Sequence, residues 1–162
     1  MRILTAVHEV APNIDAGPLL AGAQFSDAFS VTVDGAAFDA RRAAERMLGR
    51  SPRWITTLMA LRDCLVTPFG LKTSTSPTAR PHADAVGIFP VLSDTPSRLV
   101  AGFDDSHLDF RVVVDVISSG DRQCVTATTL VLTHNRLGRV YLAIILPFHR
   151  LVVRSMLRQV AA

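Results

Sequence analysis

The chain has 162 residues, of which 49% are hydrophobic and 19% charged, and its formal net charge is +3. A chain of this length can bury roughly two thirds of the surface that its unfolded form exposes, so it needs no disulfide or structural metal to fold. Because aromatic residues are few and no basic run is interleaved with them, the composition argues against a nucleic-acid-binding protein.

The first half of the chain predicts one strand followed by two short helices. The strand covers residues 27–33, where apolar and small or polar residues alternate. Asp34 is placed to cap a helix that ends at Gly49, and Ser51 and Pro52 begin a second helix. We assign no element to residues 1–24, whose order stays open. The inward stripe of the second helix is Trp54, Ile55, Leu58, Leu61 and Leu65.

Residues 72–82 mix Ser, Thr and Pro without periodicity and predict a mobile loop. Two strands follow, at 86–92 and 98–103, each ending in a turn. Pro90 indicates that the first of them is an edge strand or carries a bulge.

The clearest strand runs from 107 to 116, and a hairpin turn at 118–121 leads into the returning strand at 122–134. Hairpins between sequence neighbours predict an antiparallel sheet. We expect one face of this strand to be core and the other to be wet. The core face holds Leu108, Phe110, Val112, Val114 and Val116, and the wet face holds His107, Asp109, Arg111 and Asp115.

The last predicted element is an amphipathic helix from 139 to 159, after a loop at 135–138. Its arginines (Arg139, Arg150, Arg154 and Arg158) fall within a narrow arc, and apolar residues such as Val140, Ile144 and Leu151 occupy the rest. Pro147 should kink it. We therefore expect one α+β domain over 1–162.

The sequence also predicts a cytoplasmic location. Residues 1–13 lack the apolar core of a signal peptide, and the apolar run 140–148 is far shorter than the roughly 20 residues of a transmembrane segment. Cys64 and Cys124 show no zinc-ligand spacing, so we expect two buried, reduced thiols and no metal.

The order of elements resembles the helix-grip architecture of the START and Bet v 1-like superfamily, which includes polyketide-cyclase-like proteins. This resemblance implies a curved antiparallel sheet wrapped around the last helix, with an apolar ligand between them. Local strings are similar to a bacterial domain family of unknown function, DUF2867, which is sometimes attached to nucleotide-sugar epimerase-like oxidoreductases. The strings are Gly87 to Pro90, His107 to Arg111, Asn135 to Arg139 with Tyr141, and Pro147 to His149. The chain has no GxGxxG after a strand, so we expect no dinucleotide cofactor.

Two histidines are candidates for a site between sheet and helix. His149 is placed to face a cavity, but a core histidine bonded to a backbone carbonyl is favoured because no partner acid is identifiable. For His134 a turn residue is the favoured alternative. The candidate ligand-binding residues are His149, His134, Tyr141, Phe110, Trp54 and Ile145.

Three charged groups have a structural and a functional interpretation. Asp109 and Arg111 favour cross-strand ion pairs over an acid with an anion clamp. Asp104 and Asp105 favour a turn over a metal site. The arginine arc of the last helix suits a solvated face, or a phosphate or an acidic membrane surface.

Three functions follow, in order of preference. The first is binding of a small hydrophobic or amphipathic ligand, because the apolar excess could line a cavity. The second is a cyclase-like or dehydratase-like enzyme that uses His149 or His134 as a proton carrier. The third is an accessory protein that docks on an oxidoreductase, and a homodimer is a further expectation.

Overall fold

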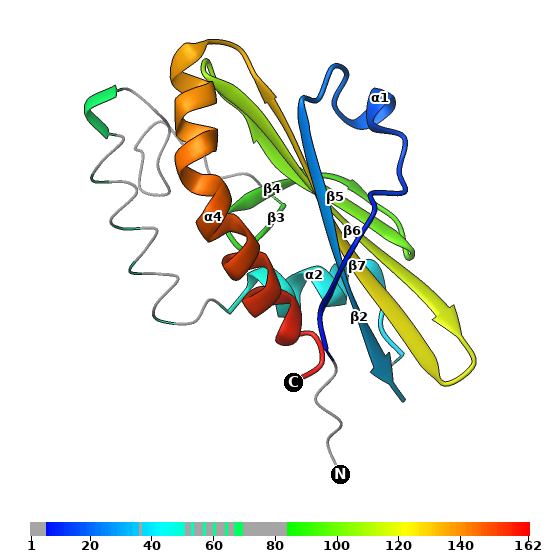
Figure 1. The fold of residues 1–162 in the computed structure, drawn as a ribbon. Helices are drawn as coiled ribbons and strands as arrows, with labels where there is room; N and C mark the ends of the chain where they lie inside the picture. The colour runs from blue at the N-terminus through cyan, green and yellow to red at the C-terminus, as the bar shows by residue number, and fades with distance from the viewer. Residues whose placement is uncertain are drawn as a thin grey trace.

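The computed structural model describes residues 6–35, 37–50, 53, 57, 60, 64, 67–69 and 84–162. Figure 1 shows a long helix lying along one face of a sheet, with the short helix α1 on the side away from it. The elements in chain order are β1 (His8–Val10), α1 (Ala16–Leu19), β2 (Phe25–Asp34), α2 (Ala40–Leu48), η1 (Thr67–Phe69), β3 (Ala85–Val86), β4 (Phe89–Asp94), β5 (Arg98–Asp104), β6 (Leu108–Ser119), β7 (Arg122–Thr133) and α4 (Arg136–Arg158).

The described strands form a seven-stranded sheet in the order β1-β2-β7-β6-β5-β4-β3, and every neighbouring pair is antiparallel. The predicted α+β class, with a long C-terminal helix packed on an antiparallel sheet, is confirmed. β1 and α1 lie in the segment to which the sequence assigned no element. The register shifts between Val91 and Ser93, which confirms the irregularity that Pro90 predicted.

The core lies between one face of the sheet and the helices α2 and α4. Phe29 and Val31 of β2 are buried there, opposite Ala127 and Val125 of β7. The alternation of strand residues places every second side chain on this face. In β6 the same face carries Val112, Val114 and Val116, all buried, as the sequence predicted.

The helix α2 begins at a different cap from the one expected. Asp34 belongs to the end of β2, where its Oδ1 lies 3.0 Å from Nε of Arg122. Asp39 is the cap instead, and its Oδ1 accepts a hydrogen bond of 2.9 Å from the Arg42 amide. The expected cap at Asp34 was wrong because the strand continues through that residue. The buried side of α2, which packs on the core, consists of Ala40, Ala43, Ala44, Met47 and Leu48.

The long helix α4 starts at Arg136, so the predicted loop at 135–138 was wrong. Asn135 adopts an extended conformation, and its Oδ1 accepts a 2.9 Å hydrogen bond from the Gly138 amide, which makes it an N-cap. The helix continues through Pro147 and packs its C-terminal part on the core with Val153, Met156 and Leu157. In Figure 1 this end lies beside α2.

By length and composition alone, α4 is the one helix among the described residues that could cross a membrane. Core helices of soluble proteins pass the same test, so the result is weak evidence for a membrane span.

The outer face of the sheet is less wet than expected. Val113 of β6 points to this face and is fully buried, and Asp109, Arg111 and Asp115 beside it are half-buried. Arg98 bonds Asp115 through Nε (2.6 Å) and Nη2 (3.1 Å). Paired charged side chains therefore lie on this face among buried apolar residues.

Much of the second predicted helix and all of the predicted loop at 72–82 lie outside the described residues, as does Trp54. Arg53, Thr57, Ala60 and Cys64 are helical and exposed. Because Cys64 is exposed, the prediction of two buried thiols was wrong for this residue, which shares the outward helical spacing of the other three. Cys124 is half-buried, and its Sγ lies 2.9 Å from Oγ of Ser30.

Candidate functional site

A row of phenylalanines crosses the core face at one end of the sheet. The register places Phe25 and Phe110 on either side of Val131, and Phe103 next to Phe110. Phe89 stacks on Phe110 and Phe103 at centroid distances of 5.3 and 6.2 Å. We call Phe25, Phe110, Phe103 and Phe89 the aromatic row. All four are half-buried, so apolar ring surface stays accessible beside the closed core.

The next row toward the core contains a carboxylate. Asp27 lies two residues after Phe25 on the same face of β2, opposite Thr129 of β7. It is only 6% exposed, and Thr129 is 2% exposed. A buried carboxylate on an apolar face is unfavourable unless it is hydrogen-bonded or paired. Asp27 therefore marks this position as a polar point in an otherwise apolar surface.

His149 of α4 is the partner of Asp27. Its Nε2 lies 3.2 Å from both carboxylate oxygens, and the geometry of a hydrogen bond is met with Oδ1. Oδ2 has no hydrogen-bond partner among the described residues. The His149 ring also meets Phe25 edge to face, with centroids 6.0 Å apart. The favoured alternative of a carbonyl-bonded core histidine is thus replaced by a carboxylate–imidazole pair.

This pair has a defined chemical capacity. When Asp27 accepts a hydrogen bond from Nε2–H of a neutral imidazole, Nδ1 is the ring's hydrogen-bond acceptor. A carboxylate in this position also fixes the orientation of the ring. His149 can accordingly accept a hydrogen bond or a proton at Nδ1, and Asp27 can accept a further hydrogen bond at Oδ2.

Three of the predicted site residues share one side of α4. Tyr141, Ile145 and His149 follow each other at spacings of four residues, and all three are half-buried. Of residues 136–150, only Gly138 is buried, so this half of α4 packs less tightly than the half beyond it. Phe110 lies on the facing side of the sheet in the aromatic row.

His134 lies elsewhere. It follows the end of β7, and its Nε2 is 3.0 Å from Oδ1 of Asp109 on the outer face of the sheet. Nη2 of Arg111 lies 2.8 Å from Oδ1 of Asp104. The cross-strand ion pair predicted for Arg111 is confirmed with Asp104, whereas Asp109 contacts His134, and His134 is not brought together with His149.

Two arginines outside the candidate site have perturbed titration. The hydrogen bonds that Arg98 donates to Asp115 raise the pKa of Arg98, and burial opposes the shift. The hydrogen bonds that Arg41 donates to Asp84 and Asp94, each 2.6 Å, raise the pKa of Arg41 far above its usual range. Both arginines stay charged at any physiological pH, and each forms ion pairs that join different parts of the fold.

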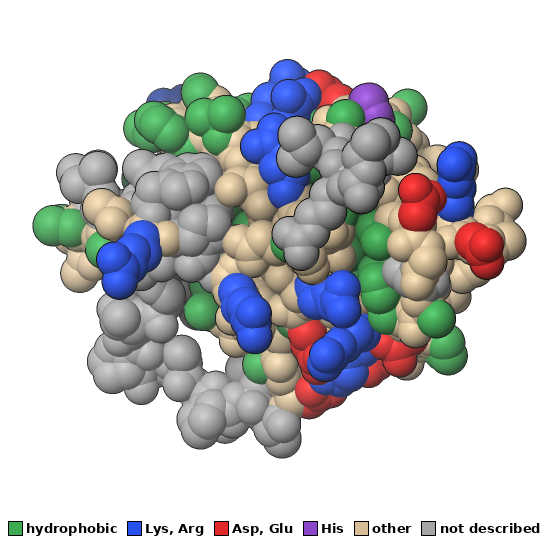
Figure 2. Space-filling view, turned by 90° about the horizontal axis from the view of Figure 1, so that it is seen from below, with side chains coloured by type: hydrophobic (Ala, Val, Ile, Leu, Met, Phe, Trp, Pro, Cys, Tyr) green, Lys and Arg blue, Asp and Glu red, His purple; other side chains and the backbone are tan. Residues whose placement is uncertain are grey.

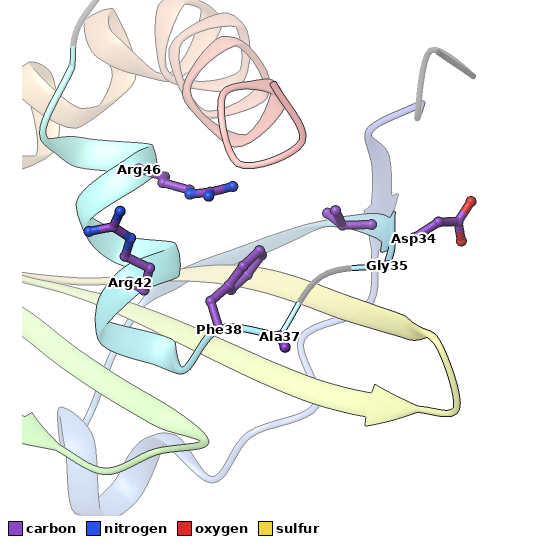
Figure 3. Close-up of a pocket in the computed structure, with 7 residues that line it drawn as sticks. Asp34, Gly35, Ala37, Phe38, Arg42 and Arg46 are labelled. Atoms are coloured by element: carbon purple, nitrogen blue, oxygen red, sulfur yellow. The ribbon is translucent and has the colours of Figure 1, made fainter. Parts of the chain in front are cut away.

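A separate pocket of about 390 Å³ lies where β2 leads into α2 (Figure 3). Arg46 is held there over the Phe38 ring, with its guanidinium carbon 5.1 Å from the centroid. Asp34 points away from the two arginines of the pocket in Figure 3. None of the predicted site residues lines this pocket. Its lining residues are Val33, Asp34, Gly35, Ala37, Phe38, Arg42 and Arg46.

At the end of the molecule seen in Figure 2, basic side chains lie close to one another with acidic ones beside them.

Two of the strings that suggested a family have structural roles. A Cβ on Gly138 would lie 2.2 Å from the His107 carbonyl oxygen, so only glycine lets the first turn of α4 approach β6 this closely. Gly87 has φ +60°, and a Cβ there would meet the Leu48 carbonyl oxygen at 2.7 Å. Gly138 thus allows α4 to lie close to the start of β6, and Gly87 allows the β3–β4 turn to lie close to the end of α2.

The described residues contain no group of three His, Cys, Asp or Glu side chains that could hold a metal ion. Fold and site together define an α+β protein in which a buried carboxylate–imidazole pair joins an antiparallel sheet to its long C-terminal helix. The chain belongs to the family described as "Protein of unknown function (DUF2867)", whose model matches residues 19–156, more than half of the sequence. No curated protein and no solved structure matched the chain.

Proposed function

We propose that this protein binds a small amphipathic molecule between the aromatic row and the side of α4 that carries Tyr141, Ile145 and His149. The observation that carries the proposal is the buried Asp27, whose Oδ2 makes no hydrogen bond among the described residues. A buried carboxylate oxygen whose one contact among the described residues is Nε2 of His149, at 3.2 Å, suits a ligand that has a hydroxyl or amine on an apolar body.

The apolar part of the site supports the same ligand class. Phe103 and Phe110 stack with centroids 5.6 Å apart, yet both stay half-buried. Small-molecule sites are commonly lined by aromatic and aliphatic side chains with a few polar groups that fix orientation. Here the rings would provide apolar contact area for the ligand, and the Asp27–His149 pair would fix the ligand's orientation.

A helix-grip relationship is part of this proposal. In that architecture the last helix and the sheet enclose the ligand, as α4 and the aromatic row do in the arrangement proposed here. The location of the protein in the cytoplasm and docking on an oxidoreductase stay predictions.

The proposal can be tested with dansylcadaverine, an amine on an apolar fluorescent body whose emission rises when it enters an apolar site. We expect saturable binding to the full chain and weaker binding by Phe103→Ala, because the variant removes one ring of the aromatic row. Ile117→Ala is the matched control, since Ile117 is 67% exposed and lies outside both the aromatic row and α4. Native mass spectrometry of the purified chain provides a second readout for any ligand that co-purifies.

Equal affinity of Phe103→Ala and the unmodified chain would overturn the proposed location. Absence of saturable binding, together with a bare mass in the native spectrum, would overturn ligand binding itself. Circular dichroism of each variant separates loss of the site from loss of the fold.

A second candidate function rests on the 3.2 Å contact between His149 and Asp27. A histidine oriented by a carboxylate is the arrangement that general bases use. In a cyclase-like or dehydratase-like reaction Nδ1 of His149 would take the proton, and Asp27 would hold the ring. His149→Gln would abolish turnover of such a substrate, whereas Asp27→Asn would shift its pH profile; unchanged turnover in His149→Gln removes this candidate.

A further inference from the structure

The helix α4 presents an apolar stripe on the side away from the core. Val140, Ile144, Phe148 and Leu151 are 56%, 62%, 51% and 60% exposed. Their spacing of four, four and three residues keeps them within an arc of about 80° and over a length of about 16 Å. We call these four residues the outer stripe. The helix therefore carries apolar side chains both toward the sheet and toward solvent.

The charges on α4 are of one sign. The helix contains five arginines (Arg136, Arg139, Arg150, Arg154 and Arg158) and no Asp or Glu. Arg136 and Arg158 are exposed at the two ends of the outer stripe. Arg150 lies 3.3 Å from Glu9 and Arg154 packs over the Phe29 ring, so these two already have partners. Exposed apolar residues bordered by cations form the surface that anionic lipid headgroups recognise.

From this stripe and the exposed Arg136, Arg139 and Arg158 beside it we propose that α4 docks on an anionic phospholipid bilayer surface. The helix lies in the plane of the headgroups, with the outer stripe inserted among the acyl chains and its exposed arginines at the phosphates. The sheet and the core then face the water. An interfacial helix of this kind buries its apolar face to a depth of roughly 5–10 Å, which side chains of this size can reach.

Charge disfavours a second copy of the chain as the occupant of the outer stripe. In an antiparallel pair of α4 helices, Arg136 and Arg139 would approach the partner's Arg154 and Arg158. A parallel pair would bring each arginine next to its own copy. Since the helix carries no carboxylate, either arrangement sets arginines against arginines and gives Arg136, Arg139 and Arg158 no carboxylate from the partner helix, whereas a phosphatidylserine surface neutralises them.

The test is co-sedimentation of the full chain with vesicles of equal parts phosphatidylcholine and phosphatidylserine, and with vesicles of phosphatidylcholine alone. We expect binding to the anionic vesicles that weakens as salt is added. Ile144→Glu with Leu151→Glu should lower the partition coefficient roughly tenfold or more, because two inserted side chains are lost. Arg136→Gln with Arg158→Gln should lower binding only on the anionic vesicles.

The matched control is Leu92→Glu with Ile117→Glu, which introduces the same residue type at two exposed apolar positions of the sheet, 52% and 67% exposed. This variant should bind vesicles within about twofold of the unmodified chain. Equal losses in both double variants would overturn the proposal, as would no binding by the unmodified chain.

Thermal unfolding and sedimentation velocity of the same stripe variant test the other occupants. A melting temperature clearly below that of the control variant would show that the outer stripe packs against this chain itself. A dimer that the stripe substitutions dissociate would show that a second copy covers it. Either result would overturn membrane docking, and neither bears on ligand binding at the aromatic row.

Discussion

Nε2 of His149 in α4 hydrogen-bonds Oδ1 of Asp27 in β2 across 3.2 Å, joining two residues that are 122 positions apart. The contact fixes the middle of the helix over the first long strand of the sheet. Both side chains are largely shielded, with His149 15% and Asp27 6% exposed. The energetic behaviour of the pair can therefore be measured by changing each partner separately.

Removing one partner of this pair should destabilise the protein more than removing both. His149→Leu leaves the buried Asp27 without its hydrogen bond, for which we expect a loss of about 1–3 kcal/mol in the free energy of unfolding. In the double variant His149→Leu with Asp27→Leu no polar group remains, so part of the loss should be recovered. Urea unfolding of the unmodified chain, of His149→Leu, of Asp27→Leu and of the double variant gives the coupling energy between the two side chains. Additive losses would mean that the two side chains do not interact in solution.

Truncation of the aromatic row should weaken the fold. Phe110→Ala removes a ring that packs on the core and stacks on two neighbours, and we expect a loss of about 3 kcal/mol. Ile117→Ala on the same strand is the control, since Ile117 is 67% exposed and should change stability by less than about 0.5 kcal/mol. Similar small losses at both positions would contradict the register of β6.

Gly138 should not tolerate a larger residue. In Gly138→Ala the new Cβ would lie 2.2 Å from the His107 carbonyl oxygen, so the first turn of α4 has to move away from β6. We expect a melting temperature several degrees lower, even though alanine is the better helix former. The neighbouring Arg139→Ala, at an exposed position, should leave the melting temperature nearly unchanged. A stabilised Gly138→Ala would show that the close approach is absent.

The two cysteines should differ in reactivity. Cys64 is exposed, whereas Cys124 is half-buried in β7 with Ser30 beside its sulfur. Iodoacetamide under native conditions should label Cys64 first, with Cys124 following at a much lower rate. Peptide mass spectrometry over time separates the two sites. Faster labelling of Cys124 would indicate that β7 opens readily at that point.

The amino-acid pattern alone predicted most of the sheet and its helices. Strand residues alternate with a period of two, so β2, β6 and β7 could be placed within a few residues of their ends. Sequence-adjacent strands meet through short turns, which settled the antiparallel pairing of β5, β6 and β7. The three-residue β1 was missed because so short an element has no period to detect.

Local chemistry was harder to place. Both Asp34 and Asp39 are suitable helix caps, and the choice between them depends on how far β2 continues to pair with β7. In the same way, Asn135 is a suitable cap residue, but whether a helix starts there depends on where β7 ends and the chain turns into α4. A strand or helix end is decided by pairing partners that lie elsewhere in the chain.

What the sequence determined by itself is most of the longer strands and helices, with the inward side of those that the structure describes, because periodicity is a local property of the chain. Only the tertiary structure decided that Asp27 pairs with His149 and that His134 lies on the outer face with Asp109. It also decided that the outer stripe of α4 is exposed. Each of these depends on which strands lie side by side and where a helix crosses them. Such distances arise between residues far apart in the chain, and no local pattern encodes them.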